Sequence, residues 1–380
     1  MKVPEAGFSA LEWTKYLIEH ETITPSKNEK KLLEEIKPDL EKAGFTVTLD
    51  EYDKKLNGRC SLSAHLHPEI DSNALCMGGH IDTVPLGTKK WDYDPFSGKI
   101  ADGKIYGRGS CDMKSGVGAL LAASIKLSSQ IRDRDFIIHL YGGEELNAEG
   151  SAHMMEEPDF YKNMSAVIIC EPTGGQPLLG HRGSLWLKLK TTGKTAHACM
   201  PHLGDNALLK LLSGITSLHD FSFDMEHPVL GKSTFAISSL HSGLNVNSIP
   251  DSAYLTIDIR TIPEQTTQYV IQRIRELVSN DIEIELLQIL PSLWTSPENE
   301  FVKQVFSTYK KITKKEPDIA AVNFATDGAS IRRVLKNVPI VILGPGETSQ
   351  AHQLNEFCRI SDIEQVQNMY EQIIKDFYSL

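Results

Sequence analysis

The chain has 380 residues, more than an average single domain, so we expect two domains. Its 41% hydrophobic and 23% charged residues are typical of a globular protein with ample material for a core. The formal net charge of −11 argues against a general nucleic-acid binder and against a binder of anionic membranes. An anionic substrate is still compatible with this charge, because a metal ion and a few arginines reverse the field locally.

Targeting and redox signals favour a cytoplasmic protein. Residues 1–8 contain one lysine and no apolar run, so we expect no signal peptide. No segment approaches the roughly 18 apolar residues of a membrane span, so we expect no membrane association. The six cysteines are scattered without a C-x-x-C pair, and several lie in apolar runs such as 168–170. Buried thiols of this kind are typical of a reducing compartment.

The first part of the chain alternates helices with apolar strands. Amphipathic patterns predict helices over 8–20 and 29–43, the second ended by Gly44, and a further helix over 115–128. Short apolar runs predict strands at 45–49, 60–66, 74–79, 136–141 and 166–170. Because some of these strands are apolar on both faces, we expect an α/β fold with a mostly parallel sheet covered by helices.

The rhythm changes after residue 175. The next predicted elements, in order, are a strand (184–192), a helix (205–219), two strands (233–240 and 252–260), a helix (265–279) and a strand (282–289). This β-α-β-β-α-β order is the ferredoxin-like pattern. The α/β rhythm then returns, with a helix over 298–313, a strand over 339–343 and a closing helix from Ser361. We therefore expect a discontinuous α/β domain (1–178 and 293–380) with an inserted domain (180–291).

The first chemically suggestive segment, residues 79–85, follows a buried strand. His80 and Asp82 are two residues apart, so on an extended backbone they face the same side. A carboxylate behind a metal-bound imidazole is a common arrangement. The alternative is a surface turn with a solvated histidine, and taken in isolation so short a motif favours that alternative.

Asp112 lies in a glycine-containing turn before an Ala/Leu-rich helix. Gly107 and Gly109 allow a sharp backbone approach, and the acid is suited to a metal or, equally, to capping the helix. The glycines do not form a phosphate-binding loop, because neither G-x-x-x-x-G-K-[ST] nor G-x-G-x-x-G is present.

Two further apolar strands lead to acids. Glu144 and Glu145 follow one, and Glu171 follows another. Ligands of an open α/β sheet bind at the carboxyl ends of its strands, and adjacent acids there repel unless a cation or a proton offsets them. The alternative is a solvated turn, but several apolar segments that all lead to ligand-type residues make coincidence a poorer explanation.

The sequence resembles the zinc amidohydrolase family that includes acetylornithine deacetylase, succinyl-diaminopimelate desuccinylase, aminoacylase and related di-zinc carboxypeptidases. The resemblance rests on ordered motifs that span most of the chain, at 79–85, 106–114, 142–145, 171–173, 192–198, 247–250, 258–260 and 344–353. It implies a di-zinc exopeptidase-like fold whose ferredoxin-like insertion is a dimerisation domain, and hence a homodimer.

The resemblance also implies the metal ligands. His80 and Glu171 would hold one zinc, and His352 and Glu145 would hold the other. Asp112 would bridge the two ions. Imidazoles and carboxylates suit zinc, with cobalt or manganese as substitutes.

Other roles follow from the same resemblance. Glu144 would be the general base, and Asp82 would orient the first histidine. His197 would stabilise the oxyanion in the partner subunit's site, and Asn247 and Arg260 would hold the substrate's α-carboxylate or backbone. Without the resemblance these last three would be an exposed histidine, a turn asparagine and a strand-face arginine.

We expect hydrolysis of the amide bond of a small N-acyl amino acid, of the N-acetylornithine or N-succinyl-diaminopimelate type used in amino-acid biosynthesis. In this family the residue at the position of Glu171 tends to be Glu in deacylases and Asp in peptidases. The alternatives are a di-zinc dipeptidase or carboxypeptidase with the same site and, from a different class, a non-catalytic metal-binding protein.

Overall fold

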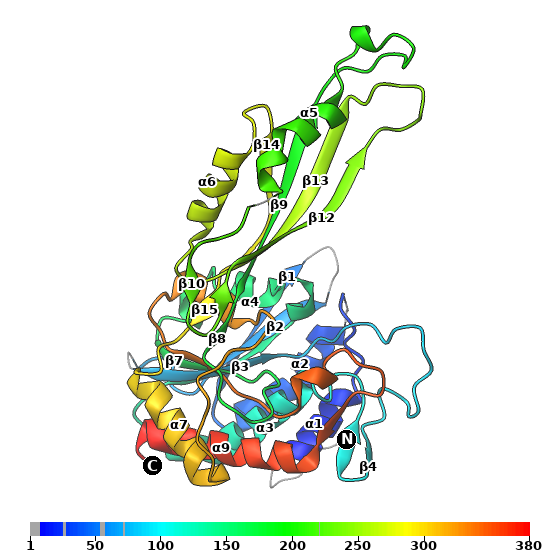
Figure 1. Cartoon of the computed structure of the whole chain (residues 1–380). Coiled ribbons are helices and arrows are strands. Elements are labelled where there is room, and N and C mark those ends of the chain that lie inside the picture. Colours follow the sequence, from blue (N-terminus) through cyan, green and yellow to red (C-terminus); the bar gives the residue numbers. More distant parts are fainter. Residues whose placement is uncertain (1–7, 26–27, 54–57, 71–72, 220) are drawn as a thin grey trace. The chain divides into compact units, whose positions relative to one another are not determined.

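The computed structural model describes residues 8–25, 28–53, 58–70, 73–219 and 221–380 (Figure 1). Residues 1–7, part of the expected first domain and of the segment expected to lack a signal peptide, lie outside this description. The chain forms two compact units. The first comprises the described residues of Met1–Gly180, Trp294–Val322 and Thr326–Leu380, and the second comprises His181–Leu293 and Asn323–Ala325.

A six-stranded sheet forms the centre of the first unit. In spatial order its strands are β1 (Thr46–Asp53), β2 (Arg59–His65), β6 (Phe136–Tyr141), β3 (Ala74–His80), β7 (Met164–Ile169) and β16 (Ile340–Ile342). The last four run parallel, whereas β1 pairs antiparallel with β2, and β2 with β6. The sheet is therefore mixed, and the expected parallel order holds for part of it only. Few residues separate β1 from β2, and such a short connection requires antiparallel strands.

Helices pack against this sheet and one another to build the core. They are α1 (Ala10–Ile18), α2 (Asn28–Lys42), α3 (Lys114–Leu127), α7 (Glu300–Thr313) and α9 (Ile360–Tyr378). α3 packs against α1, α9 and β3, while α2 covers β1 and β2 (Figure 1). α1 begins later than expected because Ser9 caps it, in a reciprocal capping box with Glu12.

α3 approaches its neighbours closely because it carries two glycines. A Cβ at Gly116 would lie 2.0 Å from the carbonyl oxygen of Cys170, and one at Gly118 would lie 2.5 Å from Oγ1 of Thr14. The start of this helix is thereby pressed against the end of β7. As a result, the residues just before α3 and just after β7 are held at the same edge of the sheet.

The second unit is built on a four-stranded sheet. Its strands, in the order β12 (Thr234–Ser242), β13 (Ser252–Thr261), β9 (Gly183–Thr192) and β14 (Glu283–Leu290), are all antiparallel to their neighbours. α5 (Ala207–Gly214) follows β9 and α6 (Thr267–Leu277) follows β13. Buried leucines at 185, 187 and 189 and alternating residues of β13 face the core of this unit. α5 is shorter than the expected helix at both ends: Asn206 caps its start, and it ends at Gly214.

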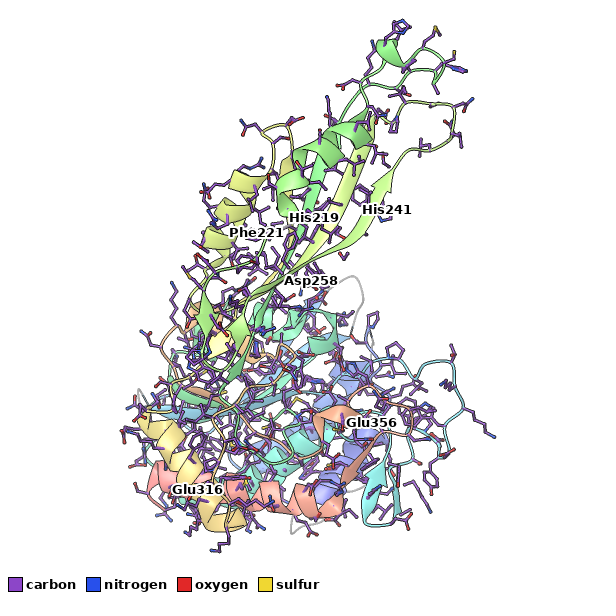
Figure 2. The ribbon with its side chains drawn as sticks, in the orientation of Figure 1. His219, Phe221, His241, Asp258, Glu316 and Glu356 are labelled. Atoms are coloured by element: carbon purple, nitrogen blue, oxygen red, sulfur yellow. The ribbon has the colours of Figure 1, made fainter. Side chains whose placement is uncertain are left out.

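A small sheet in the first unit was not predicted. It joins β17 (Phe357–Arg359), β5 (Lys104–Tyr106) and β4 (Lys99–Ala101), and its strands of three residues are too short to show a periodic pattern. Phe357 pairs with Tyr106, so Glu356, labelled in Figure 2, lies beside Gly107. The pairing therefore brings together two segments that are about 250 residues apart in the sequence.

None of the helices in the described part of the chain combines the length and apolar character that a membrane span requires.

Candidate metal centre

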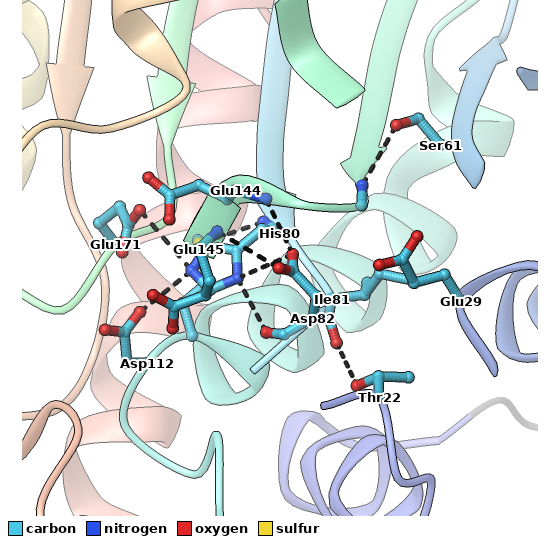
Figure 3. A network of polar contacts seen from close by, with 12 residues as sticks. Thr22, Glu29, Ser61, His80, Ile81, Asp82, Asp112, Glu144, Glu145 and Glu171 are labelled. Atoms are coloured by element: carbon cyan, nitrogen blue, oxygen red, sulfur yellow. Dashed lines mark hydrogen bonds and ion pairs between the residues drawn. The ribbon is translucent and has the colours of Figure 1, made fainter. Parts of the chain in front are cut away.

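The parallel strands of the first unit deliver most of the candidate ligands. His80 is the last residue of β3, Glu144 and Glu145 lie in a 3-10 turn after β6, and Glu171 lies two residues beyond β7. Because β6, β3 and β7 are parallel neighbours, their carboxyl ends lie at one edge of the sheet. Figure 3 shows these side chains gathered there with Asp112, which immediately precedes the α3 region.

One group of ligand-type atoms surrounds the Nε2 atom of His80. This atom lies 3.0 Å from Oδ1 of Asp112 and 3.8 Å from Oε1 of Glu171. His80 and Glu171 are buried. The other oxygen of Glu171, Oε2, is buried as well and has no hydrogen-bond partner among the described residues.

A second group surrounds His352, which lies in the loop before β17. Its Nε2 atom is 3.1 Å from Oε1 of Glu145 and 3.3 Å from Oδ2 of Asp112. In each group the potential ligand atoms lie within 4.8 Å of one another, and Asp112 belongs to both. The two carboxylate oxygens of Asp112 thus face two different histidines, each accompanied by its own glutamate.

The charges in this cluster favour a cation at its centre. Burial acts to lower the pKa of His80, but hydrogen bonding to Asp112 and the other nearby carboxylates holds that pKa well above its ordinary value. Burial, together with repulsion among the carboxylates, raises the pKa values of Glu144, Glu145 and Glu171. Crowded, desolvated acids of this kind are costly unless positive charge offsets them. With two imidazoles among them, the donor set fits divalent transition metals such as zinc.

Asp82 connects the strand that bears His80 to the turn that bears the paired acids. Its Oδ1 accepts a hydrogen bond of 3.1 Å from the backbone N–H of Glu144, and its Oδ2 accepts one of 3.3 Å from that of Glu145 (Figure 3). Nδ1 of His80 lies 3.0 Å from the backbone oxygen of Asp82 and 3.6 Å from Oδ1. The residue therefore contacts the histidine mainly through its backbone and positions the acids through its carboxylate.

The turn before these acids lies against a buried ion pair. Gly143 has a left-handed φ of 66°, and a Cβ there would lie 2.0 Å from Nη2 of Arg59. Nε of Arg59 is 3.2 Å from Oε2 of Glu29, and both residues are buried. Nη2 of Arg59 also forms an ion pair of 3.0 Å with Glu149, just beyond the turn. Only glycine fits this approach, which accounts for Gly143 directly before the two acids.

The other predicted site residues belong to the second unit. His197 and Asn247 lie in neighbouring exposed loops, where His197 pairs with Ser248 in an isolated bridge. Arg260 lies on β13 and forms hydrogen bonds of 2.8 and 2.9 Å from Nε and Nη2 to the two oxygens of Asp258. The first unit therefore contains all the proposed metal ligands together with Asp82 and the proposed base Glu144. His197, Asn247 and Arg260 lie in the second unit.

One buried acid near the candidate metal centre was not predicted from the sequence. Asp327 precedes α8 (Gly328–Val334) and is completely buried. Burial raises its pKa to about 7, with Asp82 and Glu145 among the nearby acids that contribute. In the sequence it follows Thr326 and precedes a glycine, a pattern typical of an ordinary helix start.

A mixed sheet with candidate metal ligands at the carboxyl ends of its strands is an arrangement suited to a metal-dependent hydrolase. Residues 76–376 match the model of peptidase family M20/M25/M40. A succinyl-diaminopimelate desuccinylase of Wolbachia pipientis from Culex pipiens is 31% identical over 97% of this chain and 93% of its own.

Solved structures show the same fold. A metallo-carboxypeptidase of the M20 family from Sulfolobus solfataricus superposes with a TM-score of 0.78 at 19% identity, over 98% of this chain and 100% of that one. A dinuclear metal-binding peptidase of the M20 family from Bacillus subtilis superposes with a TM-score of 0.70 at 14% identity, over 97% and 98%. The chain belongs to peptidase family M20/M25/M40 and is a metal-dependent amidohydrolase.

Proposed function

We propose that this enzyme hydrolyses the amide bond of a small N-acyl amino acid with the help of two metal ions. The ions would be held by His80, Asp112, Glu145, Glu171 and His352. The observation that carries this proposal is the position of Asp112, whose two oxygens each face a different histidine at 3.0 and 3.3 Å. A carboxylate in that position suits a bridging ligand, and a bridged metal pair activates water and polarises a carbonyl.

Glu144 is the general base of the proposed reaction. Its backbone is fixed through Asp82, and burial raises the pKa of its carboxyl well above the ordinary value. A carboxylate with a raised pKa takes a proton from the attacking water more readily, and as an acid it can then return that proton to the leaving amine. Its neighbour Glu145 faces His352, so the two adjacent acids have different tasks.

For the second unit we propose a ferredoxin-like dimerisation domain, spanning about 180–291, inserted into a catalytic domain of 1–178 and 293–380. The antiparallel sheet order and the two helices support this assignment. In a homodimer, His197 would stabilise the oxyanion in the partner's site, and Asn247 and Arg260 would bind the substrate carboxylate. Because Arg260 already pairs with Asp258, a bound carboxylate would have to share or displace that contact.

The proposed substrates are N-succinyl-diaminopimelate and N-acetylornithine, and the proposed metal is zinc, with cobalt or manganese as substitutes. The name of the Wolbachia relative supports the first substrate. A second candidate function is dipeptidase or carboxypeptidase activity, which the structural similarity to the Sulfolobus carboxypeptidase favours. A non-catalytic metal-binding role is not supported, because the proposed base and all five proposed ligands are present.

A substrate panel tests the proposal. The zinc-loaded enzyme would be assayed on N-succinyl-diaminopimelate, N-acetylornithine, simple N-acetyl amino acids and a set of dipeptides, with and without chelator. We expect the highest kcat/KM on an N-acyl amino acid and loss of all turnover on chelation. Dominant dipeptide turnover would instead support the second candidate function.

A further inference from the structure

A single buried carboxylate connects the segment that carries His352 to the segment that carries Asp112. Glu356 lies four residues beyond His352 and immediately before β17. It is completely buried. The pairing of β17 with β5 places it against residues 107–112, the turn that leads to the proposed bridging ligand.

The two oxygens of Glu356 accept four hydrogen bonds from that turn. Oε1 accepts from the backbone N–H groups of Cys111, at 2.7 Å, and Asp112, at 3.0 Å. Oε2 accepts from the backbone N–H of Gly109, at 3.0 Å, and from Nη1 of Arg108, at 2.7 Å. A carboxylate has about four acceptor positions, so this set uses its full capacity.

These contacts fix the backbone of Asp112, the proposed bridging ligand. The N–H of Asp112 and that of the preceding residue both point at the same oxygen, which fixes the plane of the peptide before the ligand. Gly346 also packs closely against this turn, since a Cβ there would lie 2.7 Å from Sγ of Cys111. The carboxylate of Glu356 therefore anchors a turn that is closely packed as well.

The arginine of this cluster extends the connection. Besides Glu356, Arg108 donates from Nη1 to the backbone oxygen of Gln353, at 3.4 Å, and from Nη2 to that of Pro85, at 3.2 Å. Gln353 directly follows His352, and Pro85 is the last residue of the segment 79–85 that contains His80. One buried ion pair thus contacts three segments that carry proposed ligands.

We propose that Glu356 is a positioning residue that holds the carboxylate of Asp112 between the two histidines, so that both metal ions bind. The inference rests on the proposed two-metal site. In that site Asp112 would have to present one oxygen to each ion, so rotation of its backbone would weaken both groups of ligands. Residues that orient metal ligands typically contribute 10- to 100-fold to metal affinity.

The test compares two buried, salt-bridged glutamates. In Glu356→Gln the amide retains one oxygen, and its NH₂ group faces two N–H donors, so one pair of hydrogen bonds is lost and the arginine loses its charged partner. In the control, Glu371→Gln, the carboxylate partners are Lys126 and Gln367, on α3 and α9 and outside the ligand segments. Both variants and the wild type would be titrated with Co²⁺, with the visible absorption spectrum, the stoichiometry and thermal unfolding as readouts.

We expect the wild type to bind two Co²⁺ ions, Glu371→Gln to bind them equally well, and Glu356→Gln to bind them about 10- to 100-fold more weakly with an altered spectrum. An unchanged affinity and spectrum in Glu356→Gln would overturn the inference and leave the two-metal proposal intact. An equal loss in Glu371→Gln would also overturn it, since general destabilisation would then explain the effect. Fewer than two ions in the wild type would refute the two-metal proposal and the inference with it.

Two further variants distinguish the backbone hydrogen bonds of Glu356 from its ion pair with Arg108. One of them also serves if Glu356→Gln does not fold. Glu356→Asp keeps the charge but is one methylene too short to serve both pairs of donors, so we expect it to weaken Co²⁺ binding as well. It replaces Glu356→Gln if that variant is insoluble, with the same outcomes. Arg108→Gln leaves the three backbone hydrogen bonds to Glu356, so we expect a smaller loss of Co²⁺ affinity. A loss of Co²⁺ affinity equal to or larger than that of Glu356→Gln would instead show that the ion pair, and not the hydrogen bonds to the backbone, causes the effect.

Discussion

At the scale of single residues, position and burial give chemically similar side chains different tasks. Glu144 and Glu145 are adjacent, yet only Glu145 lies within hydrogen-bond distance of His352. Asp82 is buried and receives two backbone N–H groups, whereas Asp327 is equally buried and its burial raises its pKa to about 7. In the proposed mechanism, the surroundings of each acid, more than its residue type, decide whether it binds metal, transfers a proton or positions a neighbour.

Replacement of Glu144 tests its proposed role as the base. In Glu144→Ala we expect kcat to fall by about 10²- to 10⁴-fold, because proton transfer in the transition state is lost. Metal content should not change, since Glu144 is not among the proposed ligands. The exposed Glu156→Ala serves as control, with kcat and metal content measured for both variants. Undiminished turnover with full metal content would refute the base role.

The buried histidine of β6 predicts part of the pH dependence of stability. Burial lowers the pKa of His139 to about 3, from an ordinary value of 6.5. Between these values the unfolded chain binds a proton that the folded chain does not, so acid destabilises the fold by up to about 1.4 kcal/mol per pH unit for this group. In His139→Asn this contribution disappears.

Urea unfolding at pH 7.5, 6.5 and 5.5 measures this contribution as the slope of the unfolding free energy against pH. We expect a shallower slope for His139→Asn than for the wild type, and an unchanged slope for the exposed control His202→Asn. A slope equal to that of the wild type in His139→Asn would show that His139 becomes protonated in the folded protein as well.

At the scale of elements, close approaches between strands, helices and turns place the proposed ligands. α3 can press against the end of β7 because Gly116 has no side chain, and the turn before Glu144 can lie against Arg59 because Gly143 has none. The β17–β5 pair brings Glu356 to the turn before Asp112. Each of these contacts joins segments that are far apart in the sequence.

A substitution at Gly116 tests the packing of α3. Helix propensity alone would make Gly116→Ala stabilising by about 1 kcal/mol. The added Cβ, however, would lie 2.0 Å from a backbone oxygen, which cannot move as a flexible side chain would. Overpacking of this kind typically costs about 1–3 kcal/mol, so we expect a net loss in the unfolding free energy measured with urea. A gain in stability would contradict the close contact between α3 and β7.

At the scale of the whole molecule, the chain combines two compact units of different architecture. The first holds the proposed ligands and base on a mixed sheet, and the second holds His197, Asn247 and Arg260 on or beside an antiparallel one. The second unit is formed from an almost continuous segment, whereas the first is assembled from both ends of the chain. Along the chain, His352 therefore lies beyond the second unit, whereas the other proposed ligands precede it.

Mixed dimers test the proposed contribution of His197 across a subunit interface. His197→Ala and Glu144→Ala should each be nearly inactive as homodimers. In a mixed dimer, the site with an intact Glu144 would receive His197 from the partner, so we expect turnover to recover to as much as half of the wild-type value per dimer. Assays of purified, differently tagged mixed dimers measure this recovery. A mixed dimer with no recovered turnover would show that His197 does not act in the partner's site.

Patterns within single segments predicted much of the secondary structure, for example the apolar β6 and β7 and the alternation of β13. They failed where the pattern was too short, as in β17, and at the limits of some helices, as at the early end of α5. The expectation of a mostly parallel sheet holds for β6, β3, β7 and β16, but the antiparallel pairing of β1 and β2 was not predicted, because pairing between strands is decided by contacts outside each strand.

The sequence by itself determined which residues could act as ligands and base, since side-chain chemistry and position at the ends of apolar runs are local properties. Only the tertiary structure decided that Asp112 faces both His80 and His352, and that Asp327 and Glu356 are buried near them. The physical reason is that coordination and burial depend on distances between segments that are remote in the chain. Those distances are set by strand order, by close packing at glycines and by hydrogen bonds such as those of Glu356.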